Sequence, residues 1–400
     1  MKPLPTIDMF EVTRLTREGR LHEAMAMLRG EAQPSASSGA ETVKTTPEDT
    51  YQAIDLMPPG MSEASWTLAQ PAASPPRSVG TGDVSLPEGV RKLMGRFSHP
   101  DFVSSDHGGT GIAVPGGARF EDRTFANAAG SRAYKLYVPG IFRGEALPLI
   151  VMLHGCTQSP DDFAAGTRMN EVAEELGFFV AYPGQSKSAN ASKCWNWFNG
   201  GDQKRGQGEP SLIAGITHEI MRDFPVPEGQ VYVAGLSAGG AAAAVMGETY
   251  PDLFAAVGVH SGLACGVASD MASAFGAMRD GGSRAGSSRR GAGTILPTIV
   301  FHGDRDATVN PLNADQVIAQ AKADATLRST ISHGTTPGGM RFTKTVAMDE
   351  AGHPVLEQWT LHGAGHAWSG GSSAGSYTDP NGPDASHEMA RFFLQNARRT

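Results

Sequence analysis

Short apolar runs separated by turns recur through the last two thirds of this chain. Two early runs, residues 119–125 and 133–139, predict a pair of antiparallel strands. Six later runs are nearly continuous in aliphatic and aromatic residues, and they cover residues 149–153, 178–182, 231–234, 255–259, 298–301 and 355–361. Continuous apolar strands separated by helical segments predict a parallel sheet that helices bury on both faces.

Helical spacing of apolar positions predicts several of the covering helices. One helix is expected over residues 160–176, a second over 210–224 and a last one over 385–397. A stretch rich in Gly, Ser and Arg, residues 276–293, predicts a mobile surface loop. The predicted fold class is therefore α/β, with a mostly parallel central sheet flanked by helices.

The first part of the chain has a different pattern. Residues 1–30 predict a helical hairpin, and residues 31–110 are rich in Ala, Ser, Pro and Thr, which predicts a disordered linker. Residues 111–400 then form the main α/β domain. Because a single hairpin cannot bury its own apolar face, we expect residues 1–30 to dock on that domain or to contact a partner protein or a granule.

Composition narrows the classes of partner. The chain has 400 residues with 50 Gly and 26 Pro, which fits many loops, and its 40% hydrophobic content is enough for a full core. A net charge of -8 argues against nucleic acid or an anionic membrane as the main partner. No apolar run is long enough for a membrane span, and residues 1–8 lack the apolar core of a secretory signal, so we expect neither.

The apolar run that ends at residue 234 is followed by Gly-Leu-Ser-Ala-Gly-Gly and then by an alanine-rich segment, residues 241–250, which is made mostly of helix-forming residues. A strand, a tight turn and a helix in this order predict a nucleophile elbow with Ser237 at its tip. Flanking glycines let the turn close, and the first N–H of the helix, that of Ala238, is placed to stabilise an oxyanion. The alternative is an ordinary turn in which Ser237 only caps the helix.

Ligands of an open parallel sheet bind beyond the carboxyl ends of its strands, so the residues that follow each strand are candidates. The loop His-Gly-Cys-Thr-Gln after residue 153 is expected to give a second oxyanion donor, the backbone N–H of Cys156. Otherwise it is a plain turn with a small buried cysteine. After residue 301 come Asp304 and Asp306, and the spacing from the His-Gly turn favours Asp306 as a triad acid, with Asp304 as a turn former.

Two histidines follow the last strand. His366 lies in a glycine-flanked loop and completes the chain order Ser, Asp, His, whereas His362 lies nearer the strand end and is its rival. Clustered histidines raise the question of a metal, but no ligand spacing such as H-E-x-x-H occurs, so we expect no metal.

With these residues in place, the chain resembles the polyhydroxybutyrate (PHB) depolymerase family of esterases, within the α/β-hydrolases. The resemblance covers roughly residues 118–397. It rests on the motifs LHGCTQ at 153–158, DDF at 161–163, CWNWF at 194–198, GEP at 208–210, GLSAGG at 235–240, HSG at 260–262, His302-Gly303 with Asp306, and GHAWSGG at 365–371.

The resemblance implies a serine esterase acting on short-chain poly(3-hydroxyalkanoate) or its oligomers. It carries the triad over to Ser237, Asp306 and His366, and the oxyanion donors to Cys156 and Ala238, with no cofactor. Feruloyl or acetylxylan esterase activity is the alternative, and a non-catalytic hydrolase fold that binds a partner is a different class. The family resemblance implies an extracellular location. Because no secretory signal peptide is visible, the cytoplasm is the alternative.

Aromatic and sulfur side chains near the predicted site leave two questions open. Trp195, Trp197 and Trp368 are candidates for apolar contact with the substrate, or else they cover the core. The three cysteines of the chain allow one disulfide at most. Cys156 and Cys194 could pair, whereas in a reducing cytosol both would remain thiols.

Overall fold

The computed structural model of this chain describes residues 114–282, 295–323 and 325–398, all within a unit that runs from Val84 to Thr400. The predicted hairpin at residues 1–30 and the linker at 31–110 lie outside the described residues. The strands are β1 Arg119–Asn127, β2 Gly130–Val138, β3 Leu149–Leu153, β4 Phe179–Pro183, β5 Val231–Leu236, β6 Ala256–His260, β7 Thr298–Gly303, β8 Arg328–Thr335, β9 Arg341–Met348, β10 Pro354–His362, β11 Trp368–Ser369 and β12 Thr378–Asp379. The helices are α4 Pro160–Thr167, α5 Met169–Leu176, a 3-10 turn η1 Gly200–Gln203, α6 Gly208–Asp223, α7 Ala238–Thr249, α8 Met271–Asp280, α9 Leu312–Lys322 and α10 Ala385–Gln395.

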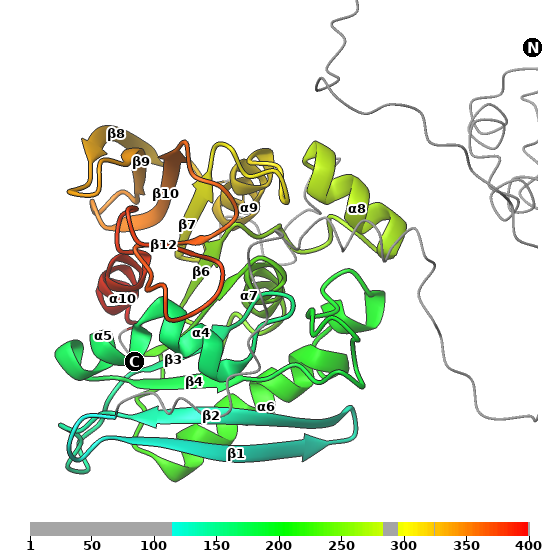
Figure 1. Ribbon diagram of the computed structural model, residues 1–400, viewed down its shortest axis with the longest axis vertical. Coiled ribbons are helices and arrows are strands. Elements are labelled where there is room, and N and C mark those ends of the chain that lie inside the picture. Colours follow the sequence, from blue (N-terminus) through cyan, green and yellow to red (C-terminus); the bar gives the residue numbers. More distant parts are fainter. Residues whose placement is uncertain (1–113, 283–294, 324, 399–400) are drawn as a thin grey trace, which may run out of the picture. The chain divides into compact units, whose positions relative to one another are not determined.

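Ten strands form one sheet in the order β1-β2-β4-β3-β5-β6-β7-β10-β9-β8. The strands from β4 to β10 in this order are parallel to one another, as predicted. Antiparallel strands flank them at both ends: β1 and β2 on one side, and β9 and β8 on the other. In Figure 1 the β1–β2 pair and the β8–β9 hairpin lie at opposite ends of the sheet.

The sheet has a hydrophobic core on each face, which explains why strand β3 is apolar at every position. Along β3, Leu149, Val151 and Leu153 pack into one core with helices α6 to α9. The alternate residues Ile150 and Met152 pack into the other core with α4, α5 and α10. Because successive side chains of a strand point to opposite faces, a strand covered on both sides needs no polar position.

The structure departs from the sequence expectations at three places. The helix expected over residues 160–176 is two helices, because Arg168 adopts a left-handed backbone conformation, with φ 57°, that ends α4 and begins α5. Helix α8 extends to Asp280, so the first residues of the expected 276–293 loop are helical, while residues 283–294 lie outside the described residues. The β8–β9 hairpin and helix α9 were not predicted.

Candidate active site

The serine of the predicted elbow stands where β5 ends and α7 begins. Ser237 has φ 58° and ψ -120°, a conformation that is strained for a residue with a Cβ and that recurs at functional sites. Its backbone N–H donates to the carbonyl of His260, 2.9 Å away, at the end of the neighbouring strand β6. A Cβ at Gly239 would lie 2.0 Å from the carbonyl oxygen of Leu153, so only glycine lets α7 approach β3 so closely.

Asp306 lies just beyond β7, with only 6% of its surface exposed. Its Oδ1 accepts hydrogen bonds from the backbone N–H groups of Thr308 and Val309, at 2.8 and 2.9 Å. Burial raises the pKa of Asp306, but hydrogen bonds from His302 and His366 outweigh that effect and hold the pKa below its ordinary value. The carboxylate is therefore ionised despite its burial.

His366 follows β10 and reaches back to β7. Its Nδ1 donates to Asp306 Oδ2 across 2.7 Å, the pairing that the sequence favoured. With the proton on Nδ1, the remaining nitrogen Nε2 is the basic atom. No hydrogen bond joins Ser237 to His366 in the described part of the chain, although both follow the carboxyl ends of parallel strands of one sheet.

The two rival residues form a pair of their own. His362 Nδ1 donates to Asp304 Oδ2 at 2.9 Å, and Asp304 Oδ1 accepts the N–H of Gly363 at 2.7 Å. On its other side, His362 Nε2 lies 2.8 Å from Thr343 Oγ1 on β9. This partly exposed pair ties the end of β7 to the end of β10, and so it fixes the two loops that carry Asp306 and His366.

His302, at the end of β7, contacts the same carboxylate, which the sequence did not lead us to expect. Its Nε2–H is shared between the carbonyl of Val309, 2.9 Å away, and Asp306 Oδ2, 3.4 Å away. The side chain is 3% exposed, and its Nδ1 is buried without a hydrogen-bond partner. In the sequence, only the His302-Gly303 dipeptide drew attention to His302, and its spacing indicated Asp306 rather than a role for His302 itself.

The loop after β3 packs directly against the elbow. A Cβ at Gly155 would lie 3.6 Å from Ser237 Cβ, so the residue that precedes Cys156 adjoins the serine. None of the hydrogen bonds between described residues uses the backbone N–H of Cys156 or of Ala238. Both N–H groups therefore stay candidates for the oxyanion donors that the sequence predicts.

A disulfide joins Cys156 to Cys194, with Cα atoms 4.2 Å apart, and settles the pairing that the sequence left open. Further bonds fix the same loop, because the Thr157 N–H donates to Ser192 O at 2.7 Å and the Gly155 N–H donates to Gln158 Oε1 at 2.9 Å. The third cysteine, Cys265, is buried. The expected oxyanion loop is therefore held by a covalent bond as well as by hydrogen bonds.

Two buried, neutral histidines support the strand ends. Burial lowers the pKa of His154 to about 4, its Nδ1 donates to Gly155 O at 2.7 Å, and its Nε2 accepts the N–H of Gln185 at 3.0 Å. Burial likewise lowers the pKa of His260 to about 3, and its Nε2 accepts the N–H of Ser369 at 3.0 Å. Each imidazole thus joins one strand end to a neighbouring loop.

A buried carboxylate organises the loop that carries Cys194. Glu209 is 5% exposed and accepts hydrogen bonds from the backbone N–H and the side-chain amide of Asn196, at 2.7 and 2.8 Å, and from the Gln185 amide. Burial raises its pKa, opposed by these hydrogen bonds. Arg132 lies 3.4 Å away as its ion-pair partner. The motif GEP at 208–210 contains Glu209, but the sequence alone indicated no role for this residue.

The three candidate tryptophans lie in the core. Trp195 and Trp368 are 0% exposed and Trp197 is 6% exposed. The indole N–H of Trp195 donates to His154 O at 3.1 Å, and that of Trp368 donates to Ser386 Oγ at 3.1 Å. Of the two alternatives that the sequence left open, this burial favours packing in the core over contact with a substrate.

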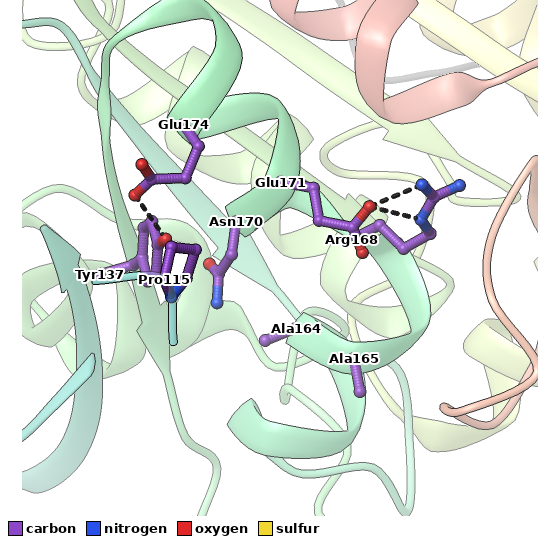
Figure 2. Close-up of a pocket in the computed structure, with 8 residues that line it drawn as sticks. All are labelled: Pro115, Tyr137, Ala164, Ala165, Arg168, Asn170, Glu171 and Glu174. Carbon is purple, nitrogen blue, oxygen red and sulfur yellow. Dashed lines mark hydrogen bonds and ion pairs between the residues drawn. The ribbon is translucent and has the colours of Figure 1, made fainter. Parts of the chain in front are cut away.

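A small cavity of about 90 Å³ lies elsewhere, between β2 and the pair α4–α5. Figure 2 shows Asn170 in the middle of its lining, with Pro115 and Tyr137 to one side and Ala164 to the other. Its lining includes no residue of the candidate site. Within the described ranges, no three His, Cys, Asp or Glu side chains are grouped to hold a metal ion. In that part of the chain, no helix is long and apolar enough to cross a membrane.

A serine on a strand–helix elbow, with an Asp–His pair at the same edge of a mostly parallel sheet, defines an α/β-hydrolase. Residues 132–330 match the family described as "Esterase PHB depolymerase", and this part of the chain belongs to that family of esterases.

Individual relatives agree with this assignment. The chain is 35% identical over 228 residues to the poly(3-hydroxyalkanoate) depolymerase C of Paucimonas lemoignei, covering 55% of this chain and 54% of that protein. It is 35% identical over 117 residues to a feruloyl esterase B of Neurospora crassa, covering 29% of this chain and 39% of that one. The chain therefore spans about half the length, or less, of these curated relatives.

A solved structure supports the fold alone. The acetyl xylan esterase from Aspergillus awamori matches 69% of this chain and 99% of its own, with a TM-score of 0.54 and 20% identity.

Proposed function

We propose that this protein is a serine esterase that hydrolyses short-chain poly(3-hydroxyalkanoate) or its oligomers. Ser237 is the nucleophile, His366 the general base and Asp306 the residue that orients the imidazole. The backbone N–H groups of Cys156 and Ala238 form the oxyanion hole. The observation that carries this proposal is the 2.7 Å bond between His366 Nδ1 and the buried carboxylate of Asp306, which leaves Nε2 basic.

The reaction has two steps. As Ser237 Oγ attacks the ester carbonyl, His366 Nε2 takes the hydroxyl proton and the two N–H groups stabilise the tetrahedral oxyanion. The carbon–oxygen bond to the leaving group breaks, and His366 returns the proton to the departing alkoxide. A water molecule, deprotonated by the same Nε2, then attacks the acyl-serine. The bond between the acyl carbon and Ser237 Oγ breaks, His366 Nε2 returns the proton to Oγ, and the hydroxy acid is released.

The names of the relatives guide the choice of substrate. The family description and the Paucimonas depolymerase favour a polyester of hydroxy acids. A second candidate, a feruloyl or acetylxylan ester, is favoured by the Neurospora feruloyl esterase. The same triad serves either substrate, so the two proposals differ only in the groups that flank the scissile ester.

The disulfide bears on the compartment. Disulfides persist in oxidising environments and are rare in the cytosol. The Cys156–Cys194 bond therefore favours the extracellular location over the cytoplasmic one, and we propose that the protein acts outside the reducing cytosol.

The test compares wild type, Ser237→Ala and Ser211→Ala on 3-hydroxybutyrate dimer and trimer, amorphous PHB, methyl ferulate, acetylated xylan and p-nitrophenyl butyrate. Ser211 lies on α6, where its hydroxyl bonds to Gly208 and Asn127 and to none of the proposed catalytic residues, and it is the matched control. We expect the hydroxybutyrate esters to be the best substrates, and Ser237→Ala to lower kcat by roughly 10⁴- to 10⁶-fold, as in other triads.

Each other outcome contradicts a particular part of the proposal. More than a tenth of the activity left in Ser237→Ala would remove this serine from the mechanism. Hydrolysis of methyl ferulate or acetylated xylan alone would replace the polyester with the second substrate class. No hydrolysis of any ester would favour a non-catalytic fold that binds a partner.

A further inference from the structure

With the tryptophans buried, a different aromatic side chain faces solvent beside the candidate site. Tyr377 is 36% exposed, and no other aromatic side chain among the described residues is as open. It lies in the turn before β12, a segment that the sequence did not mark as functional. Aromatic side chains commonly provide the apolar contact with a ligand at a binding site.

The backbone of Tyr377 is tied to the loop that carries His366. The N–H of Trp368, two residues after His366, donates to the carbonyl of Tyr377 at 2.7 Å, and β11 pairs with β12 at Trp368 and Thr378. Tyr377 itself has φ 53°, a left-handed conformation that is uncommon for an aromatic residue. Its position is therefore imposed by the surrounding contacts rather than by local preference.

The preceding residue connects the same turn to the oxyanion loop. The N–H of Ser376 donates to Asp162 Oδ1 at 2.9 Å, and its carbonyl accepts from Gln158 Nε2 at 3.1 Å. Gln158 Oε1 in turn accepts the N–H of Gly155. The turn that carries Tyr377 is thus fixed on one side by the His366 loop and on the other by the loop of Cys156.

The phenol reaches across to the oxyanion loop itself. Tyr377 Oη lies 3.4 Å from Thr157 Oγ1. Because the Thr157 hydroxyl already donates to the carbonyl of Cys156 at 2.6 Å, the phenol is the donor in this contact. The phenol therefore contacts the residue next to the proposed oxyanion donor, while 36% of the Tyr377 surface is exposed to solvent.

We infer that the ring of Tyr377 is a substrate contact, and that it packs against the aliphatic part of the ester next to the scissile carbonyl. This inference rests on the proposed function. The Thr157 hydroxyl orients the phenol, while the face of the ring provides the apolar surface. The ligand class is an ester with a short aliphatic hydroxyacyl unit, and the contact contributes to binding in the ground state and in the transition state alike.

The test measures KM and kcat for the 3-hydroxybutyrate trimer with Tyr377→Ala, Tyr377→Phe and Ile331→Ala. Ile331, on β8, is 66% exposed and is the matched control for loss of an exposed apolar side chain. We expect Tyr377→Ala to raise KM roughly threefold to tenfold, the range of one aromatic contact, with kcat within about twofold. Tyr377→Phe recovers most of this loss, and Ile331→Ala leaves KM unchanged.

A binding measurement separates this inference from the proposed function. Titration calorimetry of the trimer with Ser237→Ala, alone and combined with Tyr377→Ala, gives Kd without turnover, and the same rise in Kd is expected. An unchanged KM and Kd in Tyr377→Ala overturns the contact while the esterase stands. A Tyr377→Phe protein as defective as Tyr377→Ala overturns the role of the ring. No binding of the trimer by Ser237→Ala, together with no hydrolysis by wild type, overturns both proposals.

Discussion

Removal of the Cys156–Cys194 disulfide should cost both stability and catalysis. The two cysteines are separated by 38 positions in the sequence. Closing a loop of that length in the unfolded chain removes an entropy worth about 4 kcal/mol at 25 °C in the chain-entropy treatment. Measured losses for native disulfides range from about 2 to 5 kcal/mol, so we expect Cys156→Ala combined with Cys194→Ala to lose about 3 kcal/mol.

Urea unfolding measures this loss. With a slope near 3 kcal/mol/M for a domain of this size, the midpoint should fall by about 1 M. Reductant should move the wild-type midpoint in the same direction, and it should leave the double variant unchanged, which is the matched control. A double variant within about 0.5 kcal/mol of wild type would refute the cross-link reasoning.

The catalytic readout tests the loop rather than the whole domain. Alanine at position 156 keeps its backbone N–H, so the proposed oxyanion donor is loosened and not removed. Loss of one such donor costs about 10² to 10³ in kcat, and a loosened donor should cost less, about tenfold. A kcat equal to that of wild type, measured below the unfolding transition, would show that the Gly155 and Thr157 hydrogen bonds hold the loop without the disulfide.

Two further predictions follow from the buried charges and histidines. Asp306→Asn should lower kcat by roughly 10⁴-fold, because it removes the carboxylate that fixes the His366 tautomer. The control Asp304→Asn should lower kcat less than tenfold. A loss in Asp304→Asn as large as that in Asp306→Asn would contradict the assignment of Asp306 as the triad acid. His154 and His260 have pKa values of about 4 and about 3 in the folded protein, against about 6.5 unfolded, so the unfolded chain binds more protons below pH 6.5. The free energy of unfolding is therefore unaffected by these histidines above about pH 6.5 and falls as the pH drops towards 4. At pH 5 the loss is about 2 kcal/mol for each histidine. A urea midpoint that is constant from pH 7.5 to 5 would contradict this prediction.

The parallel sheet and the elbow were predictable from the sequence because their signals are local. The apolar runs identified β3 to β7 and β10 to within a few residues, since a strand buried on both faces is apolar at most of its positions. The elbow was identifiable because only glycine fits where Gly239 approaches Leu153. The β8–β9 hairpin was missed for the opposite reason: most of β8 is exposed, so burial imposes no apolar pattern on it.

Long-range pairings were decided only by the tertiary structure. Two aspartates and two histidines follow β7 and β10, and the spacing in the sequence favoured Asp306 and His366 without showing that they meet. Their hydrogen bond spans 60 positions and depends on β10 lying beside β7, a neighbour relation set by the order of strands in the sheet. In the same way, the burial of the tryptophans and the place of Tyr377 beside the oxyanion loop depend on which loops pack together. The local pattern of a sequence determines each element, but the contacts that bring distant residues into one site arise from how the elements pack.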